Sequence, residues 1–163
     1  MNSPILFSNL TLAAQQVNEW KQRQEKIVFT NGCFDIFHAG HAQYLEEARQ
    51  LGDRLIVGLN SDQSVKKLKG KSRPIQSLEN RAAVLASLRC VDMVIEFDED
   101  TPIELIKKCS PNILVKGGDY RIEDMIGKDF IESIDGEVKI LSFKKDISTS
   151  SIIHRIQHLP HED

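Results

Sequence analysis

The amino-acid sequence predicts an α/β protein built on a parallel sheet of five strands with helices on both faces. Five short, β-branched apolar segments recur along the chain, and segments with helical spacing of apolar residues separate them. Each strand segment is apolar almost without interruption, which is typical of strands covered on both faces. The strands are expected at residues 27–30, 54–59, 93–97, 113–116 and 138–142, within a single domain of residues 1–163.

The helical segments begin at recognisable signals. Thr101 and Glu104 have the spacing of a capping box, and Pro102 between them suits the first helical position. The last helix carries an apolar face that includes Ile156. Helices are expected at residues 9–24, 39–51 and 77–89, from residue 102 and from residue 148, and the ends at 1–8 and 160–163 are expected to be loose. This alternation is typical of a Rossmann-like sheet.

Composition and charge restrict the function. The chain has 163 residues, of which 40% are hydrophobic, and a net charge of -3 at pH 7, the balance of an ordinary soluble globular protein. A general nucleic-acid-binding protein would be basic, so no nucleic-acid partner is expected. No apolar run reaches the roughly 18 residues of a membrane span, and the N-terminus lacks the features of a secretory signal. Three cysteines without paired spacing are typical of reduced thiols in the cytoplasm.

The chemistry of such a sheet lies at its carboxyl edge, where ligands bind beyond the ends of the strands. The first strand leads into the segment Thr30-Asn31-Gly32-Cys33-Phe34-Asp35-Ile36-Phe37-His38-Ala39-Gly40-His41. Gly32 and Gly40 permit close approach, and both histidines lie at the expected start of a helix, whose free amide groups favour an anion. Two histidines alone would be interpreted as capping or surface residues. Because glycine, histidine and helix start converge at one strand end, the segment favours a phosphate site.

Residues 32–41 resemble the Gly-x-Phe-Asp-x-x-His-x-Gly-His signature of the nucleotidyltransferase superfamily. Within it, the chain is most similar to the branch that makes ADP-heptose from ATP and heptose 1-phosphate. Besides residues 30–41, that similarity is carried by residues 52–57 with 60–62, 68–74 and 114–120. The resemblance implies a catalytic core at about residues 26–157. It also implies transfer of AMP from ATP to a sugar 1-phosphate, with release of pyrophosphate and no covalent intermediate.

Polar segments also follow the second strand, and each has a structural alternative. Asn60, Ser61 and Asp62 are equally well explained as a helix cap. The basic segment 66–73 would usually be a solvated loop, but in an acidic chain beside a phosphate site it favours anion binding. It is not a P-loop, because the glycine that such a loop requires at position 65 is replaced by Val65.

Two later segments complete the expected site. Lys116 precedes two glycines, a carboxylate and an aromatic ring at the end of a central strand, where a lysine is expensive to bury unless it meets an anion. Residues 148–150, Ser-Thr-Ser, can cap the last helix or hold phosphate groups with their hydroxyls. They resemble the Ile-Ser-Thr-Thr motif of the superfamily, with Ser150 in place of the second threonine.

The resemblance assigns roles to individual residues. Catalysis is expected of His38, His41, Lys69 and Lys116. Nucleotide binding is expected of Thr30, Asn31, Gly32, Cys33, Phe34, His38, Gly40, His41, Lys116, Gly117, Ser148, Thr149 and Ser150. Substrate binding is expected of Asp35, Asn60, Asp62, Lys69, Lys71, Arg73, Arg81, Asp119 and Tyr120. No metal site in the protein is expected, because Mg²⁺ would arrive bound to the triphosphate of ATP. The oligomeric state stays open, with a homodimer as one option.

Two alternative functions stay open at this point. A cytidylyltransferase acting on a polyol or amino-alcohol phosphate would share the histidine signature. Such enzymes tend to carry an arginine before the hydroxyl motif, where this chain has Lys144 and Lys145. A nucleotide-binding module without catalysis would share the fold, but it would not require the histidines, lysines and hydroxyls together.

Overall fold

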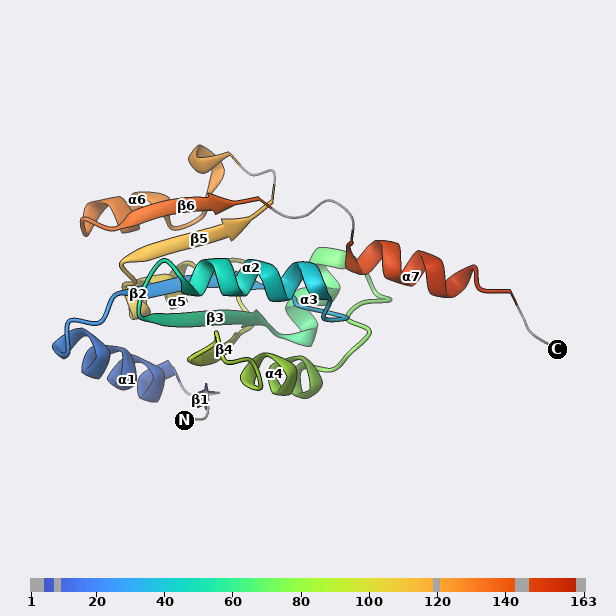
Figure 1. Ribbon diagram of the computed structural model, residues 1–163, viewed down its shortest axis with the longest axis horizontal. Coiled ribbons are helices and arrows are strands. Elements are labelled where there is room, and N and C mark those ends of the chain that lie inside the picture. The colour runs from blue at the N-terminus through green and yellow to red at the C-terminus, as the bar shows by residue number, and fades with distance from the viewer. Residues whose placement is uncertain (1–4, 8–9, 119–120, 143–146, 161–163) are drawn as a thin grey trace.

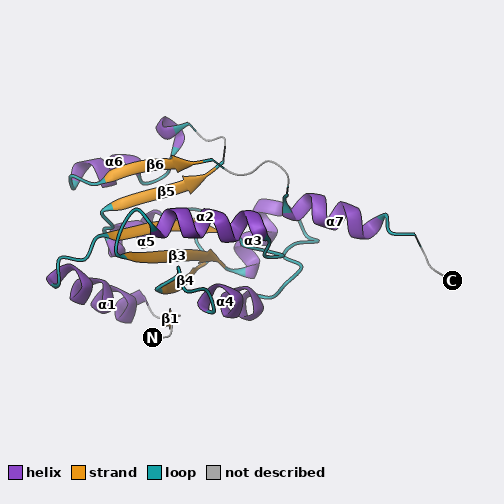
Figure 2. Cartoon of the chain, viewed as in Figure 1, coloured by secondary structure: helices purple, strands orange, loops and turns teal. Residues whose placement is uncertain are grey.

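The computed structural model describes residues 5–7, 10–118, 121–142 and 147–160, and it consists of a six-stranded sheet between helices (Figures 1 and 2). The strands run in the order β1-β4-β3-β2-β5-β6, and every neighbouring pair is parallel. The bounds are β1 Ile5–Phe7, β2 Ile27–Gly32, β3 Arg54–Asn60, β4 Met93–Phe97, β5 Ile113–Gly117 and β6 Glu137–Leu141. The α/β class and the parallel sheet expected from the sequence are therefore confirmed.

All five expected strands are present, and the sheet has one strand more than expected. The sixth, β1, comes from residues that the sequence indicated to be a loose end, and it pairs with β4 in the register Ile5↔Met93. A three-residue strand is too short to show a periodicity in sequence. Its pairing is set by the free edge that β4 offers, which is a tertiary feature.

Helices cover both faces of the sheet. The bounds are α1 Leu10–Gln22, α2 Ala39–Arg49, α3 Asp62–Lys69, α4 Leu78–Ala86, α5 Ile103–Cys109, α6 Lys128–Ser133 and α7 Thr149–Gln157, with a 3₁₀ turn η1 Ile122–Asp124. Buried side chains of α1, α5 and α6 pack on one face, and those of α2 and α4 pack on the other. Adjacent strand residues such as Val28 and Phe29 alternate between the two cores, as the pleat requires. Burial on both faces explains why the strands lack polar alternation.

One helix start differs from expectation, and the structure contains a helix and a turn that the sequence did not predict. Helix α5 begins one residue later than expected, with Pro102 as N-cap, because the Pro102 carbonyl accepts the first helical bond from the Ile106 amide at 2.9 Å. Helix α6 and the turn η1 were not expected. Helix α7 begins after Ser148 as expected, but none of its residues is buried and it runs away from the sheet (Figure 1). Its apolar face is therefore not part of the core, and Ile156 is 58% exposed.

The fold brings the polar segments to one place. The carboxyl ends of β2, β3 and β5 lie at the same sheet edge, and the first turns of α2 and α7 meet there. In the part of the chain that the structure describes, no helix is both long enough and apolar enough to cross a membrane.

Candidate active site

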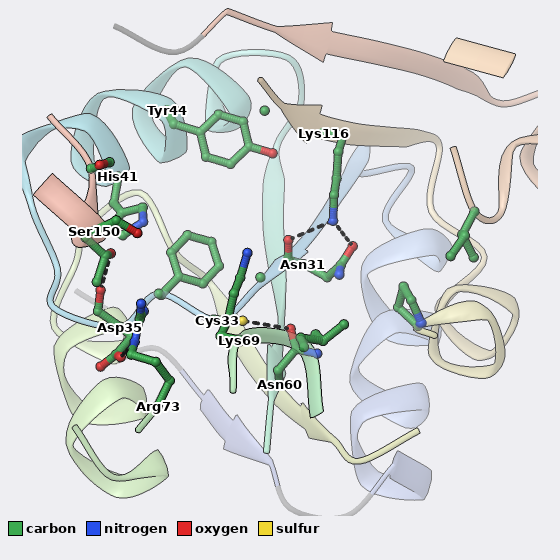
Figure 3. A pocket seen from close by; sticks show the side chains of 18 of the residues that line it. Asn31, Cys33, Asp35, His41, Tyr44, Asn60, Lys69, Arg73, Lys116 and Ser150 are labelled. Carbon is green, nitrogen blue, oxygen red and sulfur yellow. Dashed lines mark hydrogen bonds and ion pairs between the residues drawn. The ribbon is translucent and has the colours of Figure 1, made fainter. Parts of the chain in front are cut away.

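A cavity of about 700 Å³ opens at the carboxyl edge of the sheet. It is lined by side chains from the β2–α2 loop, β3, α3, β5 and the start of α7 (Figure 3). Segments more than 100 residues apart in sequence therefore line the same cavity. Fifteen of the residues expected to act in the site line this cavity. They are Asn31, Gly32, Cys33, Phe34, Asp35, His38, His41, Asn60, Lys69, Arg73, Lys116, Gly117, Ser148, Thr149 and Ser150.

The two histidines form a stacked pair at the start of α2. His38 is the N-cap residue, with an extended backbone at φ -141°, and His41 follows in the first turn. Their ring centroids are 3.8 Å apart at an interplanar angle of 19°. The Nδ1 atom of each ring is buried and has no hydrogen-bond partner among the described residues. Buried polar atoms are normally paired, so these two nitrogens are unusual. The pair also lies at a helix start, a position that favours a bound anion.

Glycine is required beside this pair. A Cβ atom on Gly40 would lie 3.1 Å from two atoms of the His38 ring and 3.4 Å from the Ile147 side chain. The His38 ring therefore rests against the helix backbone at residue 40, in space that any side chain would take. This contact gives a physical reason for the glycine between the two histidines.

The histidines are neutral in the free protein. Burial lowers the pKa of His41 to about 4, with His38 lowering it further and Asp35 opposing the change. Burial also lowers the pKa of His38. A neutral imidazole carries one N–H donor and one acceptor, so each ring can donate one hydrogen bond to a phosphate oxygen at neutral pH. A bound anion would favour the protonated form and raise both pKa values.

The low pKa of His41 predicts a pH dependence of stability. Between pH 6.5 and pH 4 the unfolded chain protonates this histidine while the folded protein does not. The free energy of unfolding therefore decreases as the pH is lowered through this range. We expect urea denaturation to show this decline in the wild type, and a shallower one in His41→Asn. One such group changes the slope by at most about 1.4 kcal/mol per pH unit. Parallel profiles for the two proteins would contradict the low pKa of His41.

The hydroxyl segment at the start of α7 is divided between structure and site. The Ser148 hydroxyl accepts a bond from the Ser151 amide at 3.1 Å, and the Ser151 hydroxyl lies 3.0 Å from the Ser148 amide, which makes a capping box. The Thr149 hydroxyl donates to the Asp35 carbonyl at 2.7 Å. Ser150 is exposed, lines the cavity and has no side-chain bond within the described part of the chain. Capping therefore explains Ser148, and the Ser150 hydroxyl is the one left to meet a ligand.

Lys116 projects from β5 into the middle of the cavity (Figure 3). Its ammonium donates to the Asn31 side-chain oxygen at 3.2 Å and lies 3.4 Å from the Asn31 carbonyl. Burial lowers its pKa, with Lys69 acting in the same direction and Cys33 opposing it. A half-buried ammonium gains from an anionic ligand, because a nearby negative charge offsets the cost of its burial.

Five of the expected site residues that the structure describes do not line the cavity, and Arg81 is the clearest correction. Its side chain is fully buried, and its three donor nitrogens bond to the Gln76 carbonyl, the Cys33 carbonyl and the Asp62 carboxylate at 2.7–3.1 Å. The geometry therefore contradicts the expectation that Arg81 contacts a substrate. Asp62 is its partner and does not line the cavity either. Ser61, by contrast, caps α3 by accepting from the Ser64 amide at 3.0 Å.

Three further expectations are also modified. The Thr30 side chain is buried and bonds to the Tyr44 hydroxyl at 2.6 Å, so it supports the cavity floor. Gly40 acts through the contact with His38, and Lys71 is exposed outside the cavity. Asp119 and Tyr120, expected to bind substrate, lie outside the described residues, as do Lys144 and Lys145.

The cavity includes residues that sequence reasoning missed. They are Tyr44, Leu68, Phe97, Asp100, Pro102, Leu114, Asp124, Met125, Ile126 and Ile147. Phe97, Asp100 and Pro102 follow or end a parallel strand, so the rule that located the other segments would also have found these. Met125 and Ile126 carry no such signal, because only the path of the chain after β5 brings them to the cavity.

Comparison with known proteins places the chain in a family. A protein-family model described as Cytidylyltransferase-like matches residues 29–155, which is most of the chain. The chain belongs to the cytidylyltransferase-like family. The match includes the glycine- and histidine-bearing segment and the hydroxyl segment that together line the cavity. The resemblance to nucleotidyltransferases is therefore confirmed, and the protein is a nucleotidyltransferase.

The relatives that match over most of this chain are bifunctional proteins named HldE. The chain is 57% identical over 141 residues to the bifunctional protein HldE of Actinobacillus pleuropneumoniae serotype 5b and 52% identical to that of Alcanivorax borkumensis. The match covers 86% of this chain, and the chain spans about 30% of the length of these relatives.

Solved structures show the same fold. The lipopolysaccharide core biosynthesis protein from Thermoplasma volcanium GSS1 is 31% identical, with a TM-score of 0.62, over 76% of this chain and 99% of that one. A pantoate–β-alanine ligase from Francisella tularensis, solved with β-γ ATP and β-alanine, has a TM-score of 0.64 over 94% of this chain and 77% of that one. At 17% identity, this second likeness supports the fold alone.

Proposed function

We propose that the protein transfers AMP from ATP to the phosphate of a sugar 1-phosphate, a heptose 1-phosphate being the expected acceptor, and releases pyrophosphate. The observation that carries this proposal is the convergence of the stacked His38–His41 pair, Ser150 and Lys116 on one cavity. That arrangement suits a chain of phosphate groups. The choice of heptose rests on the identity to HldE proteins and on the similarity of residues 114–120 to the ADP-heptose branch.

The reaction needs no protein nucleophile. An oxygen of the acceptor phosphate forms a bond to the α-phosphorus of ATP, the bond from that phosphorus to the α–β bridging oxygen breaks, and pyrophosphate leaves with the electron pair. A phosphate monoester has a second pKa of about 6, so the attacking oxygen is already ionised at neutral pH. Cys33, the thiol in the cavity, has its pKa raised by burial and stays protonated, which supports direct transfer.

Catalysis then consists of placement and charge stabilisation. His38 and His41 donate to oxygens of the transferred and leaving phosphates, and the first-turn amides and Ser150 hydroxyl of α7 bind the outer phosphates. Lys116 offsets the charge that develops near the α-phosphate from its place at the middle of the cavity. Lys69 and Arg73 also line the cavity and suit the acceptor phosphate.

Magnesium enters this proposal with ATP. Three carboxylates line the cavity, but Asp35 is used by hydrogen bonds and Asp100 is paired with Lys67 at 3.2 Å. No group of three or more metal-ligating side chains occurs among the described residues. The residues present therefore fit a Mg²⁺ ion held by the triphosphate itself, where it would neutralise part of the phosphate charge.

The proposal is tested by measuring pyrophosphate release with each nucleoside triphosphate against a panel of phosphorylated acceptors. We expect release with ATP and a heptose 1-phosphate, and little with CTP and glycerol or choline phosphate. The reverse pattern would favour a cytidylyltransferase, which the description of the family model keeps as the second candidate. Tight nucleotide binding without release from any acceptor would favour the non-catalytic module.

A further inference from the structure

The carboxylate of Asp35 is enclosed by protein donors. Its side chain is 0% exposed, although it belongs to the loop that carries the histidine signature. One oxygen accepts bonds from the Arg73 Nε atom at 2.6 Å and from the Ile75 amide at 2.8 Å, and the other accepts from the Gln76 amide at 3.0 Å. Burial alone would raise its pKa, but these donors outweigh burial and lower it. Asp35 is therefore a buried anion committed to the segment 73–76, not a group that faces a ligand.

The backbone at Asp35 makes a second attachment. Its carbonyl accepts the Thr149 hydroxyl at 2.7 Å, which ties the start of α7 to the same loop. The residues on either side, Phe34 and Ile36, have φ values of +46° and +49°. Left-handed backbone is unfavourable for side chains of this size and persists only where surrounding contacts hold it. Asp35 thus connects three segments: the β2–α2 loop to which it belongs, residues 73–76 and the start of α7.

Arg73 is the ligand-facing partner in this arrangement. Its side chain is 12% exposed and lines the cavity, and its Nε atom is occupied by Asp35. Its two terminal nitrogens have no hydrogen-bond or ion-pair partner among the described residues. A guanidinium is a planar fork, so fixing Nε also fixes the direction of the outer nitrogens. Figure 3 shows Asp35 and Arg73 together on the side of the cavity that holds His41 and Ser150.

We propose that Asp35 is a positioning residue that holds Arg73 in the orientation in which it binds the acceptor phosphate. The same bonds keep the neighbouring residues Phe34 and Ile36 in their left-handed backbone conformation. This inference rests on the proposed function. It replaces the expectation that Asp35 itself binds substrate. A carboxylate facing the acceptor would repel its phosphate, whereas a carboxylate buried behind an arginine sets the direction of that arginine.

The chain offers a matched control for a purely structural role. Asp92 also pairs with an arginine and a backbone amide, accepting from Arg54 Nη1 at 2.9 Å and from the Leu55 amide at 2.8 Å. It lies before β4, at the amino edge of the sheet, and does not line the cavity. Asp92→Asn should therefore lower stability as Asp35→Asn does, without disturbing the site.

The kinetic test compares Asp35→Asn and Asp92→Asn with the wild type, using ATP and the sugar 1-phosphate. We expect Asp35→Asn to raise the acceptor KM about tenfold and to lower kcat, because one amide nitrogen then faces a donor and the charge on the pair is lost. We expect Asp92→Asn to change KM and kcat less than twofold while lowering the melting temperature. Equal kinetic effects of both variants at similar melting temperatures would overturn the proposal.

A double-mutant cycle identifies Arg73 as the group through which Asp35 acts. If Asp35 works by orienting that guanidinium, then Asp35→Asn adds little to the acceptor KM once Arg73→Ala has been made. Independent, multiplying effects of the two substitutions on KM would contradict this route.

Amide hydrogen exchange provides a readout that does not depend on activity. The Ile75 and Gln76 amides should exchange faster in Asp35→Asn than in the wild type, and at the wild-type rate in Asp92→Asn. Unchanged protection of both amides in Asp35→Asn would overturn the role of Asp35 whatever the enzyme catalyses. A wild-type protein that adenylates no acceptor would instead contradict the proposed function, with the exchange result still deciding whether Asp35 holds the loop.

Discussion

Replacing His41 by asparagine is expected to lower kcat by about 10²–10³-fold while the protein stays folded, the effect of losing one preorganised donor of about 3 kcal/mol. His41 lies in the first turn of α2 with an unpaired buried nitrogen, and its ring stacks on His38. In the proposed reaction it stabilises charge that grows as the leaving pyrophosphate departs. The KM for ATP should change little, because the donor acts mainly in the transition state. Steady-state pyrophosphate release and circular dichroism measure the two halves of this prediction.

His154→Asn is the matched control. His154 is also a histidine that stacks on a second histidine, with ring centroids 4.2 Å apart, but it is exposed on α7 and does not line the cavity. Its replacement should leave kcat within twofold of the wild type. Wild-type turnover in His41→Asn, or an equal loss in both variants, would remove the central role of the histidine pair.

Lys116→Met is expected to separate activity from stability. The substitution removes the one charge that projects from β5 into the middle of the cavity, so kcat/KM should fall by about 10²-fold or more. The same charge is disfavoured by burial in the free protein, which is why its pKa is lowered. A methionine of similar length relieves that penalty, so the melting temperature should rise. Kinetic assays should show the loss in kcat/KM, and thermal unfolding at the same pH should show the rise in melting temperature.

The control for this prediction is Lys139→Met on the adjacent strand β6. Lys139 pairs in register with Val115 and is a partly exposed lysine that forms a surface ion pair with Glu137 at 2.9 Å. Its loss should leave activity unchanged and should not raise stability. A Lys116→Met protein that is both less active and less stable would indicate that Lys116 supports the fold and not the charge of a ligand.

The sheet could be predicted because its strands are buried on both faces. Residues 55–59 of β3 must all be apolar to lie between two layers of helices, and that requirement is visible in sequence. Strand β1 could not be predicted, because three residues carry no periodicity and the strand exists through its pairing with β4. The exposure of α7 could not be predicted for a related reason. Apolar spacing indicates a face but does not say whether the sheet lies beneath it.

The site was predictable where polar residues follow parallel strands. Asn31, Lys116 and the two histidines could be assigned to one edge, because parallel strands bring their carboxyl ends together. The roles of the charged residues around them could not. Asp35 and Arg81 carry charged groups of the kind that often bind ligands, yet both are buried and bonded to protein groups. Sequence shows that a charge is present, but only its surroundings show whether a ligand or the protein neutralises it.

From residue types and their order alone follow the parallel α/β sheet, the phosphate-suited start of α2 and membership of a family that transfers nucleotides. Periodicity and motif spacing are local properties, so both can be recognised in the sequence without the three-dimensional structure. The tertiary structure decided which charges face the cavity, which hydroxyl remains after α7 is capped, and which carboxylate fixes an arginine. These depend on distances between segments such as 35, 73 and 149, and chain folding sets those distances through burial and hydrogen bonding.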